Sequence, residues 1–253
     1  MADKNVFGNN RAEGFYQQSL RILNKSKIPY MVGGTFAVVA YTGIRRPTKD
    51  MDIFCKAGDY PKILEVFAAQ GFKTNVEDER WLAKVHQDRY FFDIIYNSGN
   101  AATPVNDQWL QESQKAKIYD IDIKILPVTE LIFSKVFIQA RVKYDGADIA
   151  HLILLKYKHI DWKRLLSYMD QNWEVLLIHL LNFRFVYPSE REVIPRWLLD
   201  ELLGRLESQM DLPTSKMKIC RGRLFSGEDY EIDVKEWGFA DLVGGKNEPR
   251  KSK

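Results

Sequence analysis

Cysteine and histidine are scarce in this chain, which has two cysteines and four histidines among 253 residues. Cys55 and Cys220 lie far apart and form no CxxC pair, and the histidines lack the spacing of a zinc site. This composition excludes a disulfide-rich secreted scaffold and a zinc centre of the usual spacing. We therefore expect free thiols and a cytoplasmic protein.

Long apolar runs are absent as well. The first residues, MADKNVFGNNRAEGF, contain no apolar segment of the kind that signal peptides carry. The longest apolar stretches are far shorter than the roughly 20 residues that cross a bilayer. The sequence thus predicts no membrane partner.

Neither sign of charge dominates, because 37 basic and 34 acidic residues leave a net charge of +3. This balance neither requires nor excludes a nucleic-acid partner. The chain is 45% hydrophobic, so it can form a sizeable core without a metal ion or a disulfide.

The spacing of apolar residues predicts an α/β (α+β) fold followed by a run of helices. In the first half, helical and strand patterns alternate, with helices at 11–26, 35–41 and 60–69, strands at 28–32 and 49–55, and hairpins at 81–96 and 116–126. From Pro127 to about Gln209 the spacing is helical. We expect a core domain over residues 1–127, a helical C-terminal domain over 128–240 and a disordered tail over 241–253.

Two acidic residues, Asp50 and Asp52, stand two positions apart in the strand pattern KDMDIFC. Side chains two apart on a strand share a face, so we expect the carboxylates to lie together while Met51 and Ile53 point into a core. Neighbouring carboxylates repel each other, and a magnesium ion relieves the repulsion while leaving positions for phosphate oxygens. The alternative is a solvated strand end, since DxD by itself is a common pattern.

A glycine pair, Gly33-Gly34, follows a strand pattern and precedes a helix that opens at Thr35. Glycines let the backbone approach a ligand, and a helix N-terminus offers N–H groups to an anion. The Thr35 hydroxyl is suited to capping the helix or binding phosphate. A simple tight turn is the alternative, and neither a Walker pattern nor GxGxxG is present.

A third carboxylate, Asp93, lies in the middle of the strand pattern RYFFDIIY. Phe92, Ile94 and Tyr96 occupy one face of this strand, and Asp93 shares the other face with Phe91. An isolated acid in such a strand costs several kcal/mol unless it is paired or ligated. Metal binding and a structural salt bridge to a nearby arginine are the two interpretations.

Taken together, GGT, KDMDIF and FFDII resemble the DNA polymerase β superfamily of nucleotidyltransferases, over roughly residues 28–155. The stretch MVGGTFAVVAYTGIRRPTKDMDIF is similar to the bacterial members related to abortive-infection toxins and antibiotic-modifying enzymes. The resemblance implies a polymerase-β-like core with a mixed sheet and two magnesium ions. The residues that it implies for catalysis and metal binding are Asp50, Asp52 and Asp93. The residues that it implies for the triphosphate are Gly33, Gly34 and Thr35, the last of which stands where many members have Ser.

Further residues near the nucleotide follow from a second resemblance. The segment PVTELIFSKVFIQARVKYDGADIAHLI resembles the part of the toxin-like members that supplies a lysine and an aspartate, here matched by Lys135 and Asp148. The alternatives are a solvated helix position for Lys135 and a helix cap or first-turn acid for Asp148. Lys49, with Arg45 and Arg46, flanks the DxD strand and either meets phosphate charge or is plain surface charge.

These patterns lead us to expect a magnesium-dependent nucleotidyltransferase. It would move a nucleoside monophosphate from a nucleoside triphosphate such as ATP to a hydroxyl acceptor and release pyrophosphate. The acceptor stays open among a small molecule such as an antibiotic, a tRNA end and a protein side chain. The alternative is a catalytically silent binding module of a toxin–antitoxin or regulatory kind, which the intact set of three carboxylates disfavours.

Overall fold

A computed structural model describes residues 10–98 and 103–243 of the chain. The tail predicted at 241–253 lies outside the described residues from 244 onward. No helix within the described ranges is long and apolar enough to span a bilayer. Cys55 and Cys220 are free and buried, as the sequence predicted.

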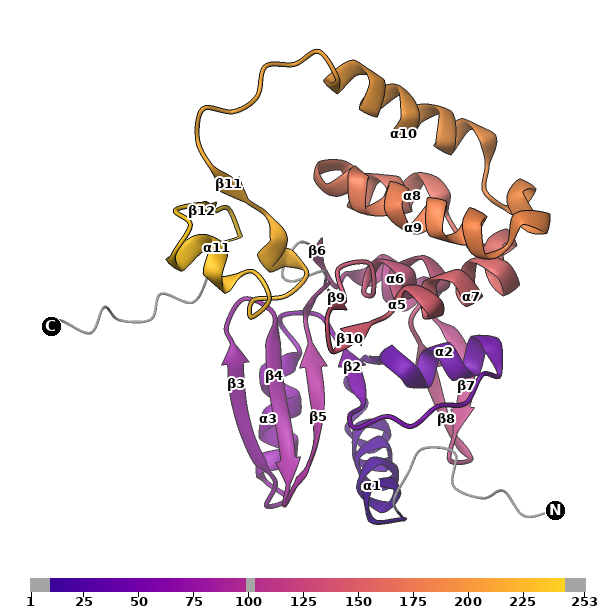
Figure 1. Cartoon of the computed structure of the whole chain (residues 1–253). Helices are drawn as coiled ribbons and strands as arrows, with labels where there is room; N and C mark the ends of the chain where they lie inside the picture. Colours follow the sequence, from indigo (N-terminus) through magenta and orange to yellow (C-terminus); the bar gives the residue numbers. More distant parts are fainter. Residues whose placement is uncertain (1–9, 99–102, 244–253) are drawn as a thin grey trace, which may run out of the picture.

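A seven-stranded mixed sheet forms the centre of the molecule, in the order β3-β4-β5-β2-β1-β8-β7 (Figure 1). The pairs β2–β5 and β1–β8 are parallel, and the other neighbours are antiparallel. The strands are β1 (Met31–Val32), β2 (Asp52–Phe54), β3 (Lys73–Asp78), β4 (Leu82–Gln87), β5 (Tyr90–Ile95), β7 (Gln114–Ile118) and β8 (Ile121–Ile125). The predicted α/β class with a mixed sheet is confirmed.

Three strands differ from the sequence prediction. The strand expected at 28–32 is reduced to its last two residues, after Pro29, which has no N–H to donate to a ladder. The strand expected at 49–55 contains only Asp52–Phe54, so Asp50 precedes it. Strand β3 was not predicted, because this edge strand has no buried residue and therefore no apolar alternation.

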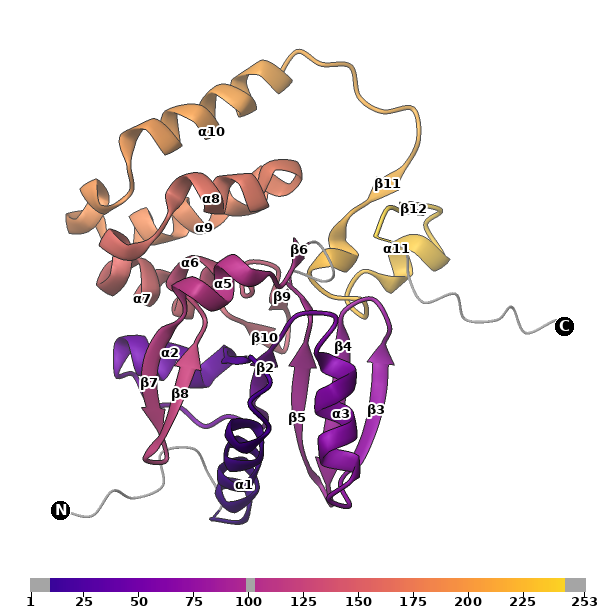
Figure 2. The same cartoon turned by 180° about the vertical axis from the view of Figure 1, so that it is seen from behind.

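Helices α1 (Asn10–Ser26) and α3 (Tyr60–Ala68) cover one face of the sheet (Figure 2). The rings of Phe15 and Phe67 pack on Phe92 of β5, at centroid distances of 6.0 Å and 5.1 Å. All three rings are buried. The apolar face predicted for β5 is therefore the face that the core occupies.

The remaining helices surround and follow the sheet. They are α2 (Gly34–Thr42), α5 (Asp107–Glu112), α6 (Val128–Phe133), α7 (Gly146–Lys156), α8 (Trp162–Tyr168), α9 (Trp173–Val186), α10 (Arg196–Gln209) and α11 (Glu231–Lys235), with short 3-10 turns η1 (Tyr157–His159), η2 (Asp170–Asn172), η3 (Pro188–Val193) and η4 (Gly222–Leu224). Short strands are β6 (Thr103–Pro104), β9 (Gln139–Ala140), β10 (Lys143–Tyr144), β11 (Ile219–Cys220) and β12 (Ala240–Asp241). Helices dominate from Val128 to Gln209, as predicted, and the β9–β10 hairpin within that stretch was not.

Candidate active site

A polar row crosses the middle of the sheet on the face opposite α1 and α3. Asp52 of β2 pairs with Asp93 of β5 in parallel register, and Asp93 pairs with Lys84 of β4 in antiparallel register. On the other side, the Gly33 N–H donates to the Asp52 carbonyl at 2.9 Å. Residues that are paired across strands share a face, so the sheet itself places these side chains together.

The alternation along each strand explains why the carboxylates emerge here. Met51, Ile53, Phe92 and Ile94 are buried in the core, as predicted, and each flanks an aspartate. Since successive strand residues point to opposite faces, burying these four side chains turns Asp52 and Asp93 away from the core. The hydrophobic pattern thus fixes which face carries the acids.

Asp50 reaches the same place from the loop before β2. Its backbone carbonyl accepts a hydrogen bond of 3.0 Å from the Thr48 hydroxyl, which also lies 3.3 Å from the Asp50 carboxylate. A single cavity of about 220 Å³ touches all three aspartates. Its other lining residues are Gly34, Thr35, Phe54, Trp81, Ile95, Ser98, Ser134, Lys135, Phe137, Ile138, Lys143 and Asp145.

The electrostatics of the cavity are those of crowded, desolvated carboxylates. The pKa of Asp52 is raised from 3.8 to about 7, chiefly by burial and also by the charges of Asp50 and Asp93, against the opposing charges of Lys135 and Lys143. Burial also raises the pKa of Asp93, and Lys84 is the main group that opposes this rise. Such shifts mark a group of acids that gains from a bound cation.

The structure pairs Asp93 with a lysine rather than with an arginine. Lys84 Nζ lies 3.3 Å from Asp93 Oδ1, and this oxygen is buried with no hydrogen-bond donor in ordinary geometry among the described residues. The ion pair and the cavity therefore share one carboxylate. The two interpretations of Asp93 drawn from the sequence are not exclusive.

The glycine turn makes room for Asp52. Gly34 has φ +52°, and a Cβ atom there would lie 1.7 Å from Asp52 Oδ2. A Cβ on Gly33 would lie 2.3 Å from the Phe54 ring. Both glycines are thus required by the packing of β2 against the turn, which the sequence did not show. Their contact with a triphosphate stays a prediction.

Lys135 and Asp148 belong to a buried ion-pair cluster. Lys135 Nζ lies 2.8 Å from Asp145 Oδ2 and 2.9 Å from Asp148 Oδ2, and Arg46 also pairs with Asp148. Arg46 Nη2 further donates to the Thr35 hydroxyl at 3.4 Å. The solvated helix position considered for Lys135 is wrong, since its side chain is 4% exposed and lies past the end of α6.

Only part of the predicted nucleotide set lines the cavity. Gly34, Thr35 and Lys135 do, whereas Asp148 lies behind Lys135 in the first turn of α7. Lys49 is exposed outside the cavity, and its carbonyl accepts a hydrogen bond of 2.9 Å from the Tyr16 hydroxyl.

Several lining residues escaped the sequence analysis. Trp81, Phe137 and Ile138 give the cavity an apolar wall, and Lys143 reaches it from the β9–β10 hairpin. No motif marks them. Lys84 differs from these residues, because a hairpin register could have located it. If Gln87 pairs with Tyr90 across the Asp88-Arg89 turn, Lys84 lies opposite Asp93.

The donor set of the cavity suits a divalent ion, although the side chains are not preset around one. Within the described ranges, no group of three or more His, Cys, Asp or Glu side chains is arranged to hold a metal ion. Hard carboxylate oxygens are nevertheless the ligands that magnesium prefers, and Asp52 and Asp93 stand on paired positions of strands spaced roughly 4.8 Å apart. The backbone thus places the two carboxylates side by side on one face of the sheet.

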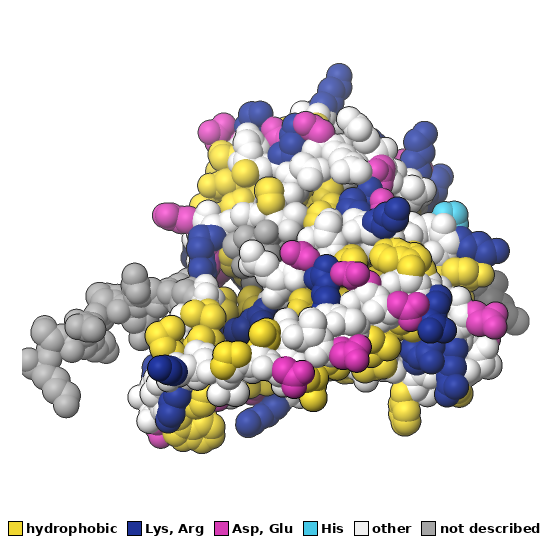
Figure 3. Space-filling model, turned by 90° about the horizontal axis from the view of Figure 1, so that it is seen from above, with side chains coloured by type: hydrophobic (Ala, Val, Ile, Leu, Met, Phe, Trp, Pro, Cys, Tyr) yellow, Lys and Arg dark blue, Asp and Glu magenta, His cyan; other side chains and the backbone are white. Residues whose placement is uncertain are grey.

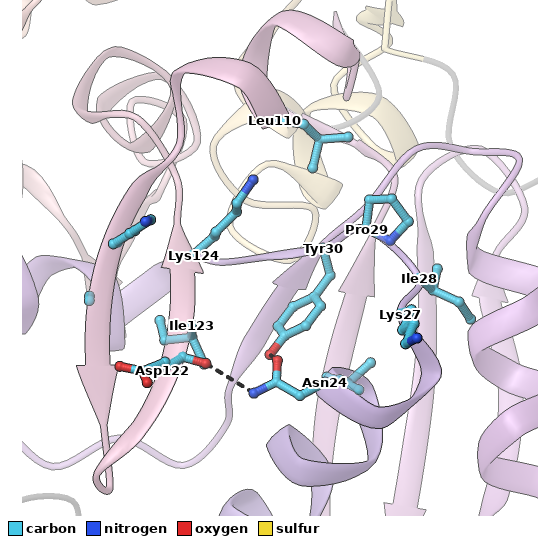
Figure 4. Close-up of a pocket in the computed structure, with 12 residues that line it drawn as sticks. Asn24, Lys27, Ile28, Pro29, Tyr30, Leu110, Asp122, Ile123 and Lys124 are labelled. Atoms are coloured by element: carbon cyan, nitrogen blue, oxygen red, sulfur yellow. Dashed lines mark hydrogen bonds between the residues drawn. The ribbon is translucent and has the colours of Figure 1, made fainter.

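A larger cavity of about 670 Å³ lies elsewhere, between the end of α1 and the β7–β8 hairpin (Figure 4). In it the Asn24 amide donates to the Asp122 carbonyl at 2.9 Å and the Tyr30 hydroxyl donates to Asn24. None of the three site aspartates lines it. Volume alone is thus a poor guide to the chemistry of this protein.

Solved structures similar to this chain are described as nucleotidyltransferases. They include the lincosamide antibiotic adenylyltransferase LnuA with lincomycin bound (20% identity, 57% of this chain and 96% of that chain, TM-score 0.42). The antibiotic-resistance factor ANT(2'')-Ia is similar at 13% identity, over 73% of this chain and 97% of that chain, with a TM-score of 0.45. A nucleotidyltransferase-like protein from Paracoccidioides brasiliensis is similar at 14% identity, over 74% and 93%, with a TM-score of 0.47. No protein-family model and no curated protein matches the chain.

Identities and TM-scores of this size do not carry an activity from one protein to another.

Proposed function

We propose that this protein is a magnesium-dependent nucleotidyltransferase that transfers a nucleoside monophosphate from a triphosphate to a hydroxyl acceptor. One observation carries the proposal: Asp52 and Asp93 stand on paired positions of adjacent strands, and Asp50 meets them in one cavity. Half-buried acids of like charge are costly to hold together, and a site that binds a cation and a polyanion gives a reason for three of them to share one cavity.

The acidic and basic residues of the cavity would bind different parts of the substrate complex. Asp50 and Asp52 would hold a divalent cation, which when bound supplies charge stabilisation for the attacking and leaving oxygens. Lys143 and Lys135 would attract the phosphates of the triphosphate, and Gly34 with Thr35 would present the start of α2 to them. The raised pKa of Asp93 suits a group that accepts a hydrogen bond or a proton from the acceptor hydroxyl.

The apolar wall of the cavity supports a ring-bearing substrate. Trp81 and Phe137 offer faces on which a nucleobase or an acceptor ring can pack, and Ile138 extends the same surface. With a substrate packed against it, this wall would limit the access of water to the carboxylates and so strengthen electrostatic contacts there.

The proposal is tested by measuring binding and transfer together. Calorimetry should show that a triphosphate binds far better with magnesium than with a chelator. With each α-labelled triphosphate and a panel of small hydroxylated compounds, tRNA and cell protein as acceptors, label should pass to one class. Equal nucleotide affinity in magnesium and in chelator would refute the metal role.

Matched variants locate the chemistry. Asp52→Asn should reduce transfer on the order of 100-fold or more, since it removes charge at the reacting phosphate. Asp122→Asn changes an 84% exposed carboxylate on β8 and should leave transfer unchanged. Magnesium-dependent nucleotide binding without transfer to any acceptor class would instead favour the catalytically silent module.

A further inference from the structure

Some acids of the cavity have a basic side chain as an ion-pair partner among the described residues, and others have none. Asp145 is paired with Lys135 at 2.8 Å, and Asp93 is paired with Lys84 at 3.3 Å. In the part of the chain that the structure describes, neither Asp50 nor Asp52 has an ion-pair partner within 4.0 Å. Asp50 and Asp52 are therefore the acids of the cavity that no ion pair within the described ranges holds, and Lys143 is a further cation that lines it.

Three observations indicate that the Lys84 side chain has a fixed position. The β4–β5 register puts its backbone opposite Asp93. Its ammonium lies 4.6 Å from the centroid of the Phe91 ring, on the same face of β5 as Asp93. The Lys84 and Asp93 side chains are only 21% and 16% exposed. The Lys84 side chain is thus packed on the sheet face and is not a solvated surface lysine.

We infer that Lys84 is a positioning residue that serves as the fixed counter-ion of Asp93, so that the site takes one divalent cation instead of two. The inference rests on the proposed function and differs from the family resemblance, which implies two ions. The single ion would be held at Asp50 and Asp52. A second cation beside Asp93 would stand next to the Lys84 ammonium, and like charges at that range repel.

The arrangement also gives Asp93 a neighbouring cation when no metal ion is bound. Burial alone favours its neutral form, and the nearby ammonium opposes this effect. A lysine cation, unlike a bound ion, is present at every metal concentration. Lys84 therefore orients the Asp93 carboxylate and opposes the rise of its pKa before any substrate arrives.

The test counts ions in the full-length protein. Manganese is titrated, by calorimetry and by electron paramagnetic resonance, into the protein saturated with an ATP analogue whose α and β phosphorus atoms are joined by methylene. The wild type should bind one ion per protein–analogue complex, and Lys84→Met should bind two. Lys84→Arg, which keeps the charge, should bind one. Lys117→Met removes a lysine paired with Asp122 on the β7–β8 hairpin and should also leave one.

Each outcome decides a separate point. Two ions in the wild type, or one ion in a folded Lys84→Met variant, would overturn the role of Lys84 and leave the nucleotidyltransferase proposal standing. If Lys84→Met does not fold, the wild-type count still decides, since two ions there contradict the inference. Absence of any manganese-dependent binding of the analogue would refute the proposed function itself.

Discussion

Asp52 is the site aspartate whose pKa is raised by burial and by both neighbouring aspartates. It is half-buried, it lies near two other carboxylates, and its pKa in the folded protein is raised to about 7 against 3.8 for an ordinary aspartate. The folded protein therefore binds a proton at Asp52 between pH 4 and pH 7 that the unfolded chain has lost. Stability of the metal-free protein must fall as the pH rises through this window.

Replacing Asp52 by Asn should remove this pH-dependent loss. In chelator, Asp52→Asn should match the wild type near pH 4 and exceed it by roughly 2–4 kcal/mol at pH 8. Urea unfolding at several pH values measures the difference. The exposed Asp122→Asn serves as the control and should show a constant offset from the wild type. A difference that shrinks as the pH rises would mean that Asp52 is stabilised as an anion.

At the scale of elements, the turn between β1 and α2 is shaped by the aspartate beneath it. Gly34 and Gly43, at the start and the end of α2, both have a positive φ. An added Cβ would strike Asp52 at Gly34, whereas nothing lies within 4 Å at Gly43. The two glycines therefore share a left-handed backbone conformation, and they differ in the atoms that an added Cβ would meet.

This difference gives a matched pair of variants. Gly43→Ala should cost about 1–2 kcal/mol from the left-handed backbone alone and leave transfer intact. Gly34→Ala should cost more and abolish transfer, because Asp52 has to move. Thermal unfolding with a transfer assay separates the two effects. Equal stability loss and equal activity in both variants would show that the turn tolerates a displaced Asp52.

At the scale of the whole molecule, one buried cluster joins the sheet half to the helical half. Lys135 follows α6, its partners Asp145 and Asp148 lie at the start of α7, and Arg46 comes from the loop after α2. The Arg46 side chain also reaches Thr35, so the cluster supports the helix start beside the cavity. The division at residue 127 that the sequence suggested stays a prediction, and this cluster crosses it.

Removing a cation from the cluster should lower the free energy of unfolding. Lys135→Met leaves the buried Asp145 with only a 4.0 Å contact to Arg46, while Asp148 keeps its ion pair with Arg46, and should cost about 3–5 kcal/mol. Arg196→Met breaks an exposed ion pair with Asp200 on α10 and should cost less than about 1 kcal/mol. Urea unfolding compares the two variants. A loss below about 1 kcal/mol in Lys135→Met would show that solvent or rearrangement compensates the two acids.

The sequence by itself determined the alternation that builds this site. Met51 with Ile53, and Phe92 with Ile94, have to be buried, and a period of two then turns Asp52 and Asp93 to the opposite face. The sequence likewise predicted a hairpin over 81–96, whereas the pairing of Gln87 with Tyr90, which puts Lys84 opposite Asp93, was found in the structure. The alternation and the hairpin follow from local geometry, in which each residue constrains its neighbours along the chain.

Only the tertiary structure decided which distant residues share the cavity. The parallel pairing of β2 with β5 brings Asp52 beside Asp93 across 41 positions, and no local pattern encodes that partner choice. Lys143, Trp81 and Phe137 enter the site from separate elements, and Lys135 became a buried ion pair rather than a surface lysine. Such contacts depend on how whole elements pack, because burial is a property of the assembled layers and not of the residue that is buried.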